Sequence, residues 1–234
     1  MLKVRDLHVR IGNLKIIQGV SLDAAAGEIV SLMGANGSGK TTLMRAVSGL
    51  GHITAGQVEF LGEDITGWPS EKIVEAGLIQ VPEGRKLFPL MTVRENLEIG
   101  AHNRRARARE KGNLEYVYTL FPELKDISSQ PAGDLSGGQQ QMVAIGRGMM
   151  AEPKLLILDE PSIGLSPIMT QKVFEAVTEI HQKGTAVLIA EQNIADVLEI
   201  ADRAYVMEQG MIRLKGSARE MRESEEIKTM YLGL

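Results

Sequence analysis

The segment that begins at Gly34 combines residue types that can bind and hold phosphate groups. Its sequence, GANGSGKTT, places three glycines before Lys40 and two threonines directly after it. Glycine lets the backbone curve around an anion so that N–H groups point inward, and Lys40 would neutralise the β- and γ-phosphates of a nucleoside triphosphate. The hydroxyl of Thr41 would bind Mg²⁺. The predicted nucleotide-binding residues of this loop are Gly34, Ala35, Asn36, Gly37, Ser38, Gly39, Lys40, Thr41 and Thr42.

A second pair of reactive groups, Asp159 and Glu160, follows the hydrophobic run LLIL and precedes Pro161. An apolar strand would deliver both carboxylates to its carboxyl end, where ligands bind in open α/β sheets. Asp159 suits a Mg²⁺ ligand, and Glu160 suits a general base that polarises an attacking water. Together with the phosphate loop, this pair predicts a nucleoside-triphosphate hydrolase.

Both motifs need strands and helices to position them, and the hydrophobic pattern predicts an alternation of the two. The runs IVSLM, LLILD and AVLIAE are almost continuously apolar, as expected of central strands in a parallel sheet covered on both faces. A helix is expected from Lys40, and an amphipathic helix that ends near Gly184 precedes the last run. Hairpins are expected at residues 12–13 and in 205–216. Residues from about 90 to 150 show helical periodicity, which predicts an α/β core interrupted by a helical insertion.

The composition is that of a globular chain, because 44% of its 234 residues are hydrophobic and 24% are charged. Cysteine is absent, no apolar run approaches the roughly 20 residues that cross a bilayer, and the start has no apolar signal-peptide core, so we expect a cytoplasmic location. The net charge of −4 excludes a general attraction to nucleic acid. One basic run, residues 102–111, is interpreted as a solvated helix face, with contact to lipid phosphates or a partner as the alternative.

A third motif, Leu135-Ser136-Gly137-Gly138-Gln139, would by itself predict a helix that begins after a serine N-cap. Because it follows the phosphate loop and precedes the carboxylate pair, it resembles the signature sequence of ABC-type ATPases. In that family two such domains face each other head to tail. The resemblance implies that these five residues supply a hydroxyl, backbone N–H groups and a helix N-terminus to the γ-phosphate held by the other domain.

The resemblance covers essentially the whole chain and implies one ABC ATPase domain, residues 1–234. The expected fold is an α/β P-loop NTPase (RecA-like) core with an N-terminal antiparallel β subdomain and an inserted helical subdomain. Residues 1–87 and 152–234 would form the ATP-binding core with the β subdomain, and residues 88–151 would form the helical signature subdomain. The implied cofactors are ATP and Mg²⁺, and the implied reaction is hydrolysis to ADP and phosphate.

Four positions depart from the pattern of most family members. Glu83 stands where most carry glutamine, in the loop that joins the core to the helical subdomain; the resemblance makes it a coupling residue and a metal ligand. Ser166 stands where aspartate is common, and Ile11 occupies the adenine-stacking position that is usually tyrosine. Gln192 replaces the histidine of the switch region, directly after the run AVLIAE.

Gln192 would face the γ-phosphate and can donate an N–H group to it, but it cannot carry a proton as histidine does. Glu160 would then be the base, and Lys40 and Gln192 would complete the catalytic set. We expect Gln192→Ala to slow turnover more than Glu191→Ala. The alternative is a catalytically degenerate site, in a switch that binds ATP and hydrolyses it negligibly.

The stretches PEGR, PSIGLSP, EQN and YLGL together resemble the second ATPase subunit of branched-chain amino acid importers, where Glu83 and Gln192 are usual. This resemblance implies an ATP-hydrolysing subunit on the inner face of the cell membrane. Its implied partners are membrane-spanning permease subunits and a second ABC ATPase, in a heterodimer or else a homodimer. A solute-binding protein would act indirectly. An importer of urea or short amides and a non-transport ABC ATPase are the alternatives.

Overall fold

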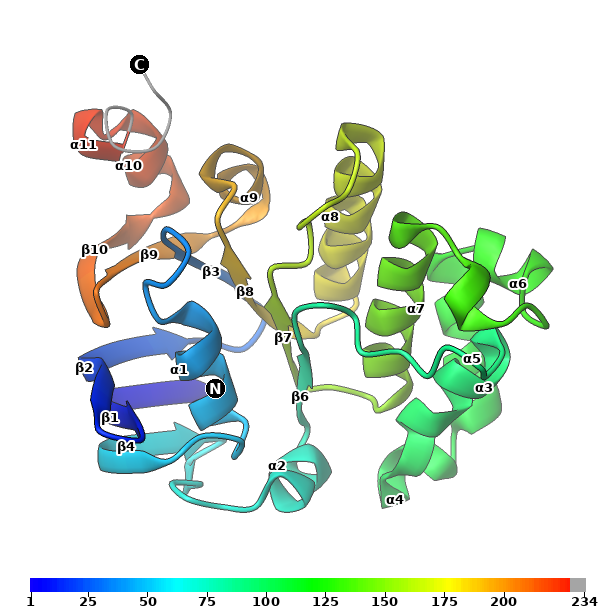
Figure 1. The fold of residues 1–234 in the computed structure, drawn as a ribbon, viewed down its shortest axis with the longest axis horizontal. Helices are drawn as coiled ribbons and strands as arrows, with labels where there is room; N and C mark the ends of the chain where they lie inside the picture. Colours follow the sequence, from blue (N-terminus) through cyan, green and yellow to red (C-terminus); the bar gives the residue numbers. More distant parts are fainter. Residues whose placement is uncertain (228–234) are drawn as a thin grey trace.

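The computed structural model describes residues 1–227 and contains two β-sheets with helices packed against them (Figure 1). In Figure 1 the N-terminal sheet lies at the lower left, the larger sheet crosses the middle, and the helices of residues 93–150 form a layer at the right. The importer-like stretch at residues 231–234 lies outside the described residues.

Four strands form the antiparallel sheet, in the order β2-β1-β4-β5. They are β1 (Leu2–Ile11), β2 (Leu14–Ala24), β4 (Ile53–Phe60) and β5 (Glu63–Asp64). The predicted first hairpin is confirmed, because Ile11 pairs with Leu14 across a turn in which Gly12 has a φ of 57°. The expected N-terminal antiparallel subdomain is therefore present.

Six strands form the central sheet, in the order β10-β9-β3-β8-β7-β6. They are β3 (Ile29–Met33), β6 (Leu78–Val81), β7 (Leu155–Asp159), β8 (Ala186–Glu191), β9 (Arg203–Glu208) and β10 (Met211–Ser217). Neighbours from β6 to β9 pair in parallel, and β10 returns antiparallel to β9. These pairings confirm the predicted central strands and the second hairpin.

Helices cover the central sheet and fill the insertion. Outside the insertion they are α1 (Lys40–Val47), α2 (Ser70–Ala76), α8 (Pro167–Gln182), α9 (Ile194–Ile200), α10 (Ala218–Glu223) and α11 (Glu225–Ile227). Within it are α3 (Val93–Ile99), the 3₁₀ helix η1 (Gly100–His102), α4 (Arg104–Arg107), α5 (Glu110–Leu120), α6 (Glu123–Asp126), the 3₁₀ helix η2 (Ala132–Asp134) and α7 (Gly137–Met150). Gly184, with a φ of 97°, ends α8 as predicted. The subdomain division at residues 87 and 151 stays a prediction.

Side chains on the two faces of the central sheet belong to different hydrophobic clusters. On β7, Leu155 and Ile157 join the cluster that contains α1 and the antiparallel sheet. Leu156 and Leu158 join the cluster formed by α7, α8 and α9. Burial on both faces explains why these strands are continuous apolar runs in the sequence rather than alternating ones.

The basic run of residues 102–111 is not one solvated helix face, contrary to the prediction. Asn103 interrupts it: the side chain is buried and caps α4 by accepting a hydrogen bond from the Ala106 N–H group at 2.8 Å. The guanidinium of Arg105 donates to the carbonyl of Glu152 at 2.9 Å. Part of the run therefore anchors the inserted helices to the chain after α7, and its other arginines are exposed.

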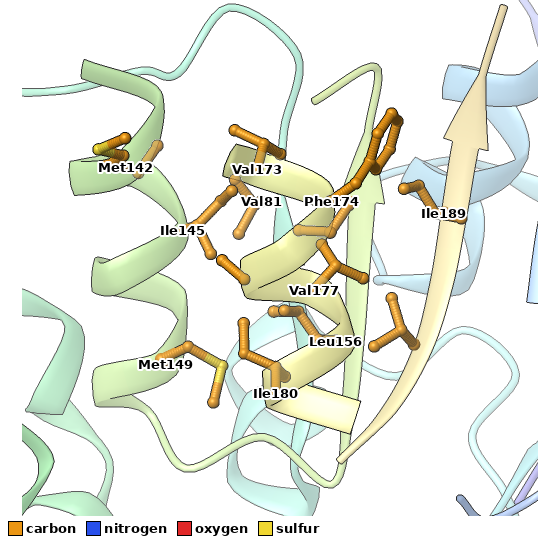
Figure 2. Packing of buried hydrophobic residues seen from close by; sticks show 14 of the residues in the cluster. Val81, Met142, Ile145, Met149, Leu156, Val173, Phe174, Val177, Ile180 and Ile189 are labelled. Atoms are coloured by element: carbon orange, nitrogen blue, oxygen red, sulfur yellow. The ribbon is translucent and has the colours of Figure 1, made fainter. Parts of the chain in front are cut away.

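Helices α7 and α8 meet over β7 in the larger hydrophobic cluster (Figure 2). Ile145 and Met149 on α7 point toward Val177 and Ile180 on α8, and Leu156 of β7 belongs to the same group. This packing joins the inserted helices to the central sheet, so the helix that carries the signature motif at its start is held by the ATP-binding core.

Truncating Ile180 tests this packing. Ile180 is fully buried, so Ile180→Ala should lower the free energy of unfolding by about 2–5 kcal/mol, because methylene groups are lost and a cavity remains. Ile168 lies on the same helix but is 71% exposed, so Ile168→Ala should change that energy by less than about 0.5 kcal/mol. Urea unfolding followed by circular dichroism measures both variants. Equal losses would contradict the orientation of α8.

Candidate functional site

Three neighbouring strands bring the candidate residues to one edge of the central sheet. Strands β3, β8 and β7 are adjacent and parallel, and Ala190 of β8 lies opposite Asp159 of β7. The phosphate loop follows β3, Glu160 follows β7, and Gln192 follows β8. Because parallel strands end at the same edge, residues distant in the sequence become neighbours there.

The phosphate loop requires glycine at two positions for different reasons. At Gly34, a Cβ atom would lie 2.3 Å from the carbonyl oxygen of Met207, so the backbone of β9 excludes a side chain. At Gly39, φ is 111°, and the chain turns there directly into α1 with Lys40 as the first helical residue. Glycine adopts this left-handed conformation without a steric penalty, so the loop can deliver Lys40 at the helix N-terminus.

The phosphate loop is fastened to the turn between β9 and β10. The Gly210 N–H group donates to the Ser38 carbonyl at 2.9 Å, and the Gly210 carbonyl accepts from the Gln18 N–H group of β2, also at 2.9 Å. A Cβ atom at Gly210 would lie 2.0 Å from the Ile16 carbonyl oxygen, so only glycine permits this approach. These bonds connect the loop to both sheets.

Lys40 is buried, and its ammonium group has three oxygen partners. Nζ donates to the carbonyl oxygens of Gly34 at 2.7 Å and Ala35 at 3.2 Å, and it forms an ion pair with Glu160 Oε1 at 2.9 Å. Both charged side chains are more than nine-tenths buried. Removing either charge would leave the other uncompensated in a setting of low dielectric constant. The structure therefore brings Lys40 and Glu160 together, as the two motifs predict.

One carboxylate oxygen of Asp159 accepts a hydrogen bond from Thr41, and the other accepts none from the described residues. The Thr41 hydroxyl donates to Asp159 Oδ1 at 3.0 Å, whereas Oδ2 is buried and has no hydrogen-bond partner among the described residues. Burial raises the pKa of Asp159 from 3.8 to about 6, and the carboxylates of Glu160 and Glu83 add to the rise. The Thr41 hydrogen bond and the charge of Lys40 act in the opposite direction.

This arrangement fits a Mg²⁺ ion. Hydroxyl and carboxylate oxygens are the ligands that Mg²⁺ prefers, and Asp159 Oδ2 is an acceptor without a partner. A dication would also offset the burial and repulsion that raise the pKa of Asp159. Thr41 and Asp159 could bind the ion, with Glu83 on the wall of the same pocket.

A pocket of about 400 Å³ opens beside these groups. Its lining residues are Ile16, Asn36, Gly37, Gly39, Lys40, Thr41, Thr42, Glu83, Glu160 and Ile163. The phosphate loop, Glu83 and Glu160 therefore surround one cavity. Gly34 and Ala35 lie behind it, where their carbonyls hold Lys40.

Ile16 lines this pocket, although the sequence analysis did not select it as a site residue. Ile11, the predicted adenine contact, is not among the lining residues. Ile11 lies at the end of β1 and is 60% exposed. Leu14, opposite Ile11, and Ile16 are two residues apart on β2 and so share one face. This alternation is the signal that indicates Ile16. The role of Ile11 as an adenine contact stays a prediction.

Gln192 is exposed, and its side chain has no hydrogen-bond partner within residues 1–227. Its backbone N–H group donates to Glu160 Oε2 and to Glu191 Oε2, both at 3.2 Å. Glu191 is the buried group here, with 1% exposure, and its Oε1 accepts from the Ser162 N–H group at 2.9 Å. Burial raises the pKa of Glu191, and the Glu160 carboxylate raises it further. The sequence analysis did not select Glu191 as a site residue, and the contact of the Gln192 side chain with a γ-phosphate stays a prediction.

The signature residues lie outside the pocket of their own chain. Ser136 caps α7 as predicted: its Oγ accepts from the Gln139 N–H group at 3.3 Å, and Gln139 Oε1 accepts from the Ser136 N–H group at 3.0 Å. At Gly138, a Cβ atom would lie 2.3 Å from the Met169 side chain of α8, so glycine permits the close approach of the two helices. Ser136 itself is exposed and accessible to a second molecule.

The loop of residues 82–92, which carries the predicted coupling residue, is held against the inserted helices. The buried side chain of Asn96 accepts from the Phe88 N–H group at 2.9 Å and donates to three carbonyls of the same loop. Arg147 of α7 donates to the Arg85 carbonyl at 2.9 Å. These bonds fix the loop between the nucleotide pocket and the helices.

Nucleoside-triphosphate hydrolases of the P-loop class bind the phosphates of the nucleotide at such a sheet edge. The lysine of the loop and acidic residues at the carboxyl end of another strand lie around these phosphates. Comparison with known families narrows this class. The chain belongs to the ABC transporter family, whose model matches residues 17–163. It binds ATP and hydrolyses it to ADP and phosphate.

Individual relatives match the chain over its full length. It is 40% identical to the high-affinity branched-chain amino acid transport ATP-binding protein BraG of Pseudomonas aeruginosa, over 100% of both chains. It is 31% identical to BraF of the same organism, over 100% of this chain and 98% of that one. The ATP-binding cassette MJ1267 of an ABC transporter superposes with a TM-score of 0.86 at 30% identity, covering 99% and 98% of the two chains. Within residues 1–227, no helix has the length and apolar character needed to cross a membrane.

Asp159→Asn tests the electrostatics of the site. The pKa of Asp159 is raised in the folded chain, so its contribution to stability is complete at acid pH and is lost as the pH rises from about 4 through about 6. In metal-free buffer the variant should therefore become more stable than the native chain across that interval, by about 1–2 kcal/mol above pH 7. Thermal or urea unfolding in EDTA at several pH values measures the difference.

Asp64→Asn is the matched control. The Asp64 carboxyl is exposed, and hydrogen bonds from Thr66 and Gln57 lower its pKa. A lowered pKa favours the folded chain above the ordinary pKa, so this variant should gain no stability as the pH rises. A gain of the same sign in both variants would show that burial of Asp159 is not the cause.

Proposed function

We propose that this ATPase powers an importer of branched-chain, hydrophobic amino acids as one of its two nucleotide-binding subunits. The observation that carries the proposal is the 40% identity, over the whole of both chains, to a protein named for high-affinity branched-chain amino acid transport. Glu83 and Gln192 support it, because both depart from the wider family and both resemble the importer branch.

Phosphate binding uses the loop and the start of α1. The backbone N–H groups of the loop and the positive end of the helix dipole face the phosphates, and Lys40 adds a full charge. A γ-phosphate oxygen replaces Glu160 as the anionic partner of Lys40, which frees the glutamate. Thr41 and Asp159, with Glu83 on the pocket wall, would hold Mg²⁺, which supplies positive charge to the β- and γ-phosphate oxygens.

Glu160 is the group that the geometry supports as the general base. Its φ of 49° bends the chain directly after β7, and its carboxylate lies in the pocket beside Lys40. The freed carboxylate accepts a proton from water while the water oxygen attacks phosphorus in line and the bond to the β–γ bridging oxygen breaks. The backbone N–H group of Gln192 donates to Glu160 Oε2, whereas Lys40 contacts Oε1.

A second ATPase molecule would complete the site. Ser136 and Gly137 lie at the start of α7, outside the pocket of their own chain and not buried, so the Ser136 hydroxyl and the Gly137 N–H group are placed to meet the γ-phosphate of another molecule. A non-identical partner is favoured, since BraG and BraF are two ATP-binding proteins of one organism and both resemble this chain. A homodimer is the alternative.

A groove beside the loop of residues 82–92 suits the membrane-spanning partner, which would place the chain on the inner face of the membrane. The groove has a volume of about 350 Å³ and lies between β6 and the inserted helices. Its lining is mainly apolar and includes Phe88, while Leu90 of the same loop is 95% exposed. A partner bound there would contact the loop that carries Glu83, so a structural change at the nucleotide pocket would be transmitted to the partner through this loop. The solute-binding protein would act through the membrane subunits.

Glu160→Gln tests the base. Hydrolysis should fall by about 10²–10⁴-fold, the usual contribution of a general base, while ATP binding persists. The bound nucleotide should then hold two chains together, so the molecular mass from light scattering should rise with ATP. Glu199 is an exposed glutamate of α9, and Glu199→Gln should change neither quantity. Normal hydrolysis by the Glu160 variant would contradict its role.

The importer assignment is tested with the same variant. Glu160→Gln is purified with ATP from the membranes of its native cell, and its companions are identified by mass spectrometry. Two multi-spanning subunits and a second ATPase would support the importer, and a co-encoded binding protein that takes leucine, isoleucine or valine would support the solute. A binding protein specific for urea or short amides would contradict the solute, and ribosomal proteins or nucleic acid would contradict transport.

A further inference from the structure

Glu191 is a buried carboxylate that no step of the proposed mechanism uses. It is the last residue of β8, where it pairs with Met33 of β3, while its neighbour Ala190 pairs with Asp159 of β7. Glu191 is only 1% exposed. An apolar residue of similar size would be less costly to bury, so the carboxylate at this place calls for a reason.

The alternation of β8 shows which way Glu191 points. Val187 and Ile189 belong to the cluster formed with α8 and α9, whereas Leu188 and Ala190 belong to the cluster formed with α1. Glu191 follows Ile189 by two residues and therefore lies on the α8 side of the sheet. It is thus directed toward the loop between β7 and α8, and not toward the phosphate-binding helix.

The two oxygens of Glu191 bind two different segments. Oε1 accepts from the Ser162 N–H group at 2.9 Å, in the loop that follows Glu160. Oε2 accepts from the Gln192 N–H group at 3.2 Å, and the same N–H group donates to Glu160 Oε2 at 3.2 Å. One side chain therefore connects the end of β8, the loop after β7 and the carboxylate of Glu160.

The loop after β7 borders open space near Glu191. A cavity of about 360 Å³ beside these bonds is lined by Glu160, Ser162, Ile163, Glu191, Gln192 and Asn193. Glu160 and Ile163 also line the nucleotide pocket, so the loop separates two open spaces. Main-chain bonds from Glu160 to Ala190 and from Leu165 to Ser162 also hold this loop, and the bond from the Ser162 N–H group to Glu191 is the side-chain contact that joins it to the end of β8.

We propose that Glu191 is a positioning residue for ATP hydrolysis, which holds the Ser162 and Gln192 backbones so that the Glu160 carboxylate stays aligned. The inference rests on the proposed role of Glu160 as the base. Glu191 touches no phosphate and acts through the shared N–H group and through the loop after Glu160. A carboxylate suits this task because it accepts at both oxygens and donates at neither.

Three substitutions separate acceptor number from size. Glu191→Gln keeps the size but offers one acceptor oxygen, so its amide group would oppose one of the two N–H donors. Glu191→Leu removes both acceptors, and Glu191→Asp keeps both but withdraws them by one methylene group. The kcat for hydrolysis should be highest for the native chain, lower for Glu191→Asp, lower again for Glu191→Gln and lowest for Glu191→Leu. The loss in kcat for Glu191→Gln should be about 10- to 100-fold. The Kd for ATP, measured by calorimetry in EDTA, should stay within about twofold.

A double variant of the full-length chain distinguishes positioning from general structural support. If Glu191 acts through Glu160, adding Glu191→Gln to Glu160→Gln causes no further loss of hydrolysis, so the two effects are not additive. Thermal midpoints and the Kd for ATP are measured for every variant. Glu199→Gln is the control and should keep the native kcat, Kd and thermal midpoint.

Additive effects in the double variant would overturn the inference. So would a joint loss of ATP affinity and thermal stability in all three Glu191 variants, because that result indicates structural support alone. A native kcat in Glu191→Leu, beside an inactive Glu160→Gln, would overturn the inference and leave the base assignment standing. Native hydrolysis by Glu160→Gln would overturn the base assignment and the inference together.

Discussion

Three parallel strands that end side by side impose the geometry of the nucleotide site. Strands β3, β8 and β7 are buried on both faces, so a shift of any one of them would open one of two hydrophobic clusters. The phosphate loop, Asp159 and Glu191 are therefore placed relative to one another by packing and ladder hydrogen bonds beneath them. The hydrogen bonds of Glu191 and the ion pair of Lys40 with Glu160 act within this frame.

The charges that this edge brings together oppose one another. Burial raises the pKa of Asp159 to about 6, repulsion from Glu160 and Glu83 adds to the rise, and the buried ammonium group of Lys40 offsets it only in part. A bound triphosphate would add further negative charge next to these three carboxylates. In the proposed mechanism, binding of the nucleotide, binding of a cation at Thr41 and Asp159, and release of Glu160 from Lys40 would consequently be coupled electrostatically.

Local and contiguous patterns in the sequence predict much of this arrangement. The three central strands follow from unbroken apolar runs, the phosphate loop from its spacing, and the N-cap at Ser136 from a serine directly before two glycines. Each of these signals depends on neighbours within a few residues. The carboxyl-end position of Asp159 and Glu160 follows from the strand pattern by the general rule for parallel sheets.

Features that depend on distant contacts were not predictable in the same way. The contact between the Glu191 carboxylate and the Ser162 N–H group depends on strand order, because β8 lies beside β7 in the sheet although the two strands are separated in the sequence by α8. The basic run of residues 102–111 predicts exposure by its charge, but Arg105 finds a carbonyl partner at Glu152. Charge and polarity indicate what a side chain can bind, whereas the tertiary structure determines which groups lie next to it.

The backbone bonds from Gly210 to Ser38 and from Gln18 to Gly210 join parts of the chain without using any side chain. They connect the phosphate loop, the β9–β10 turn and the N-terminal sheet through main-chain groups alone. The loop of residues 82–92 is attached to the inserted helices in the same way, because the N–H groups of Ala132 and Gly133 donate to its carbonyls, and side-chain bonds from Asn96 and Arg147 add to these. Main-chain groups are the same at every residue, so sequence change at these junctions is limited by steric fit, as at Gly210, and not by the loss of a bonding side chain.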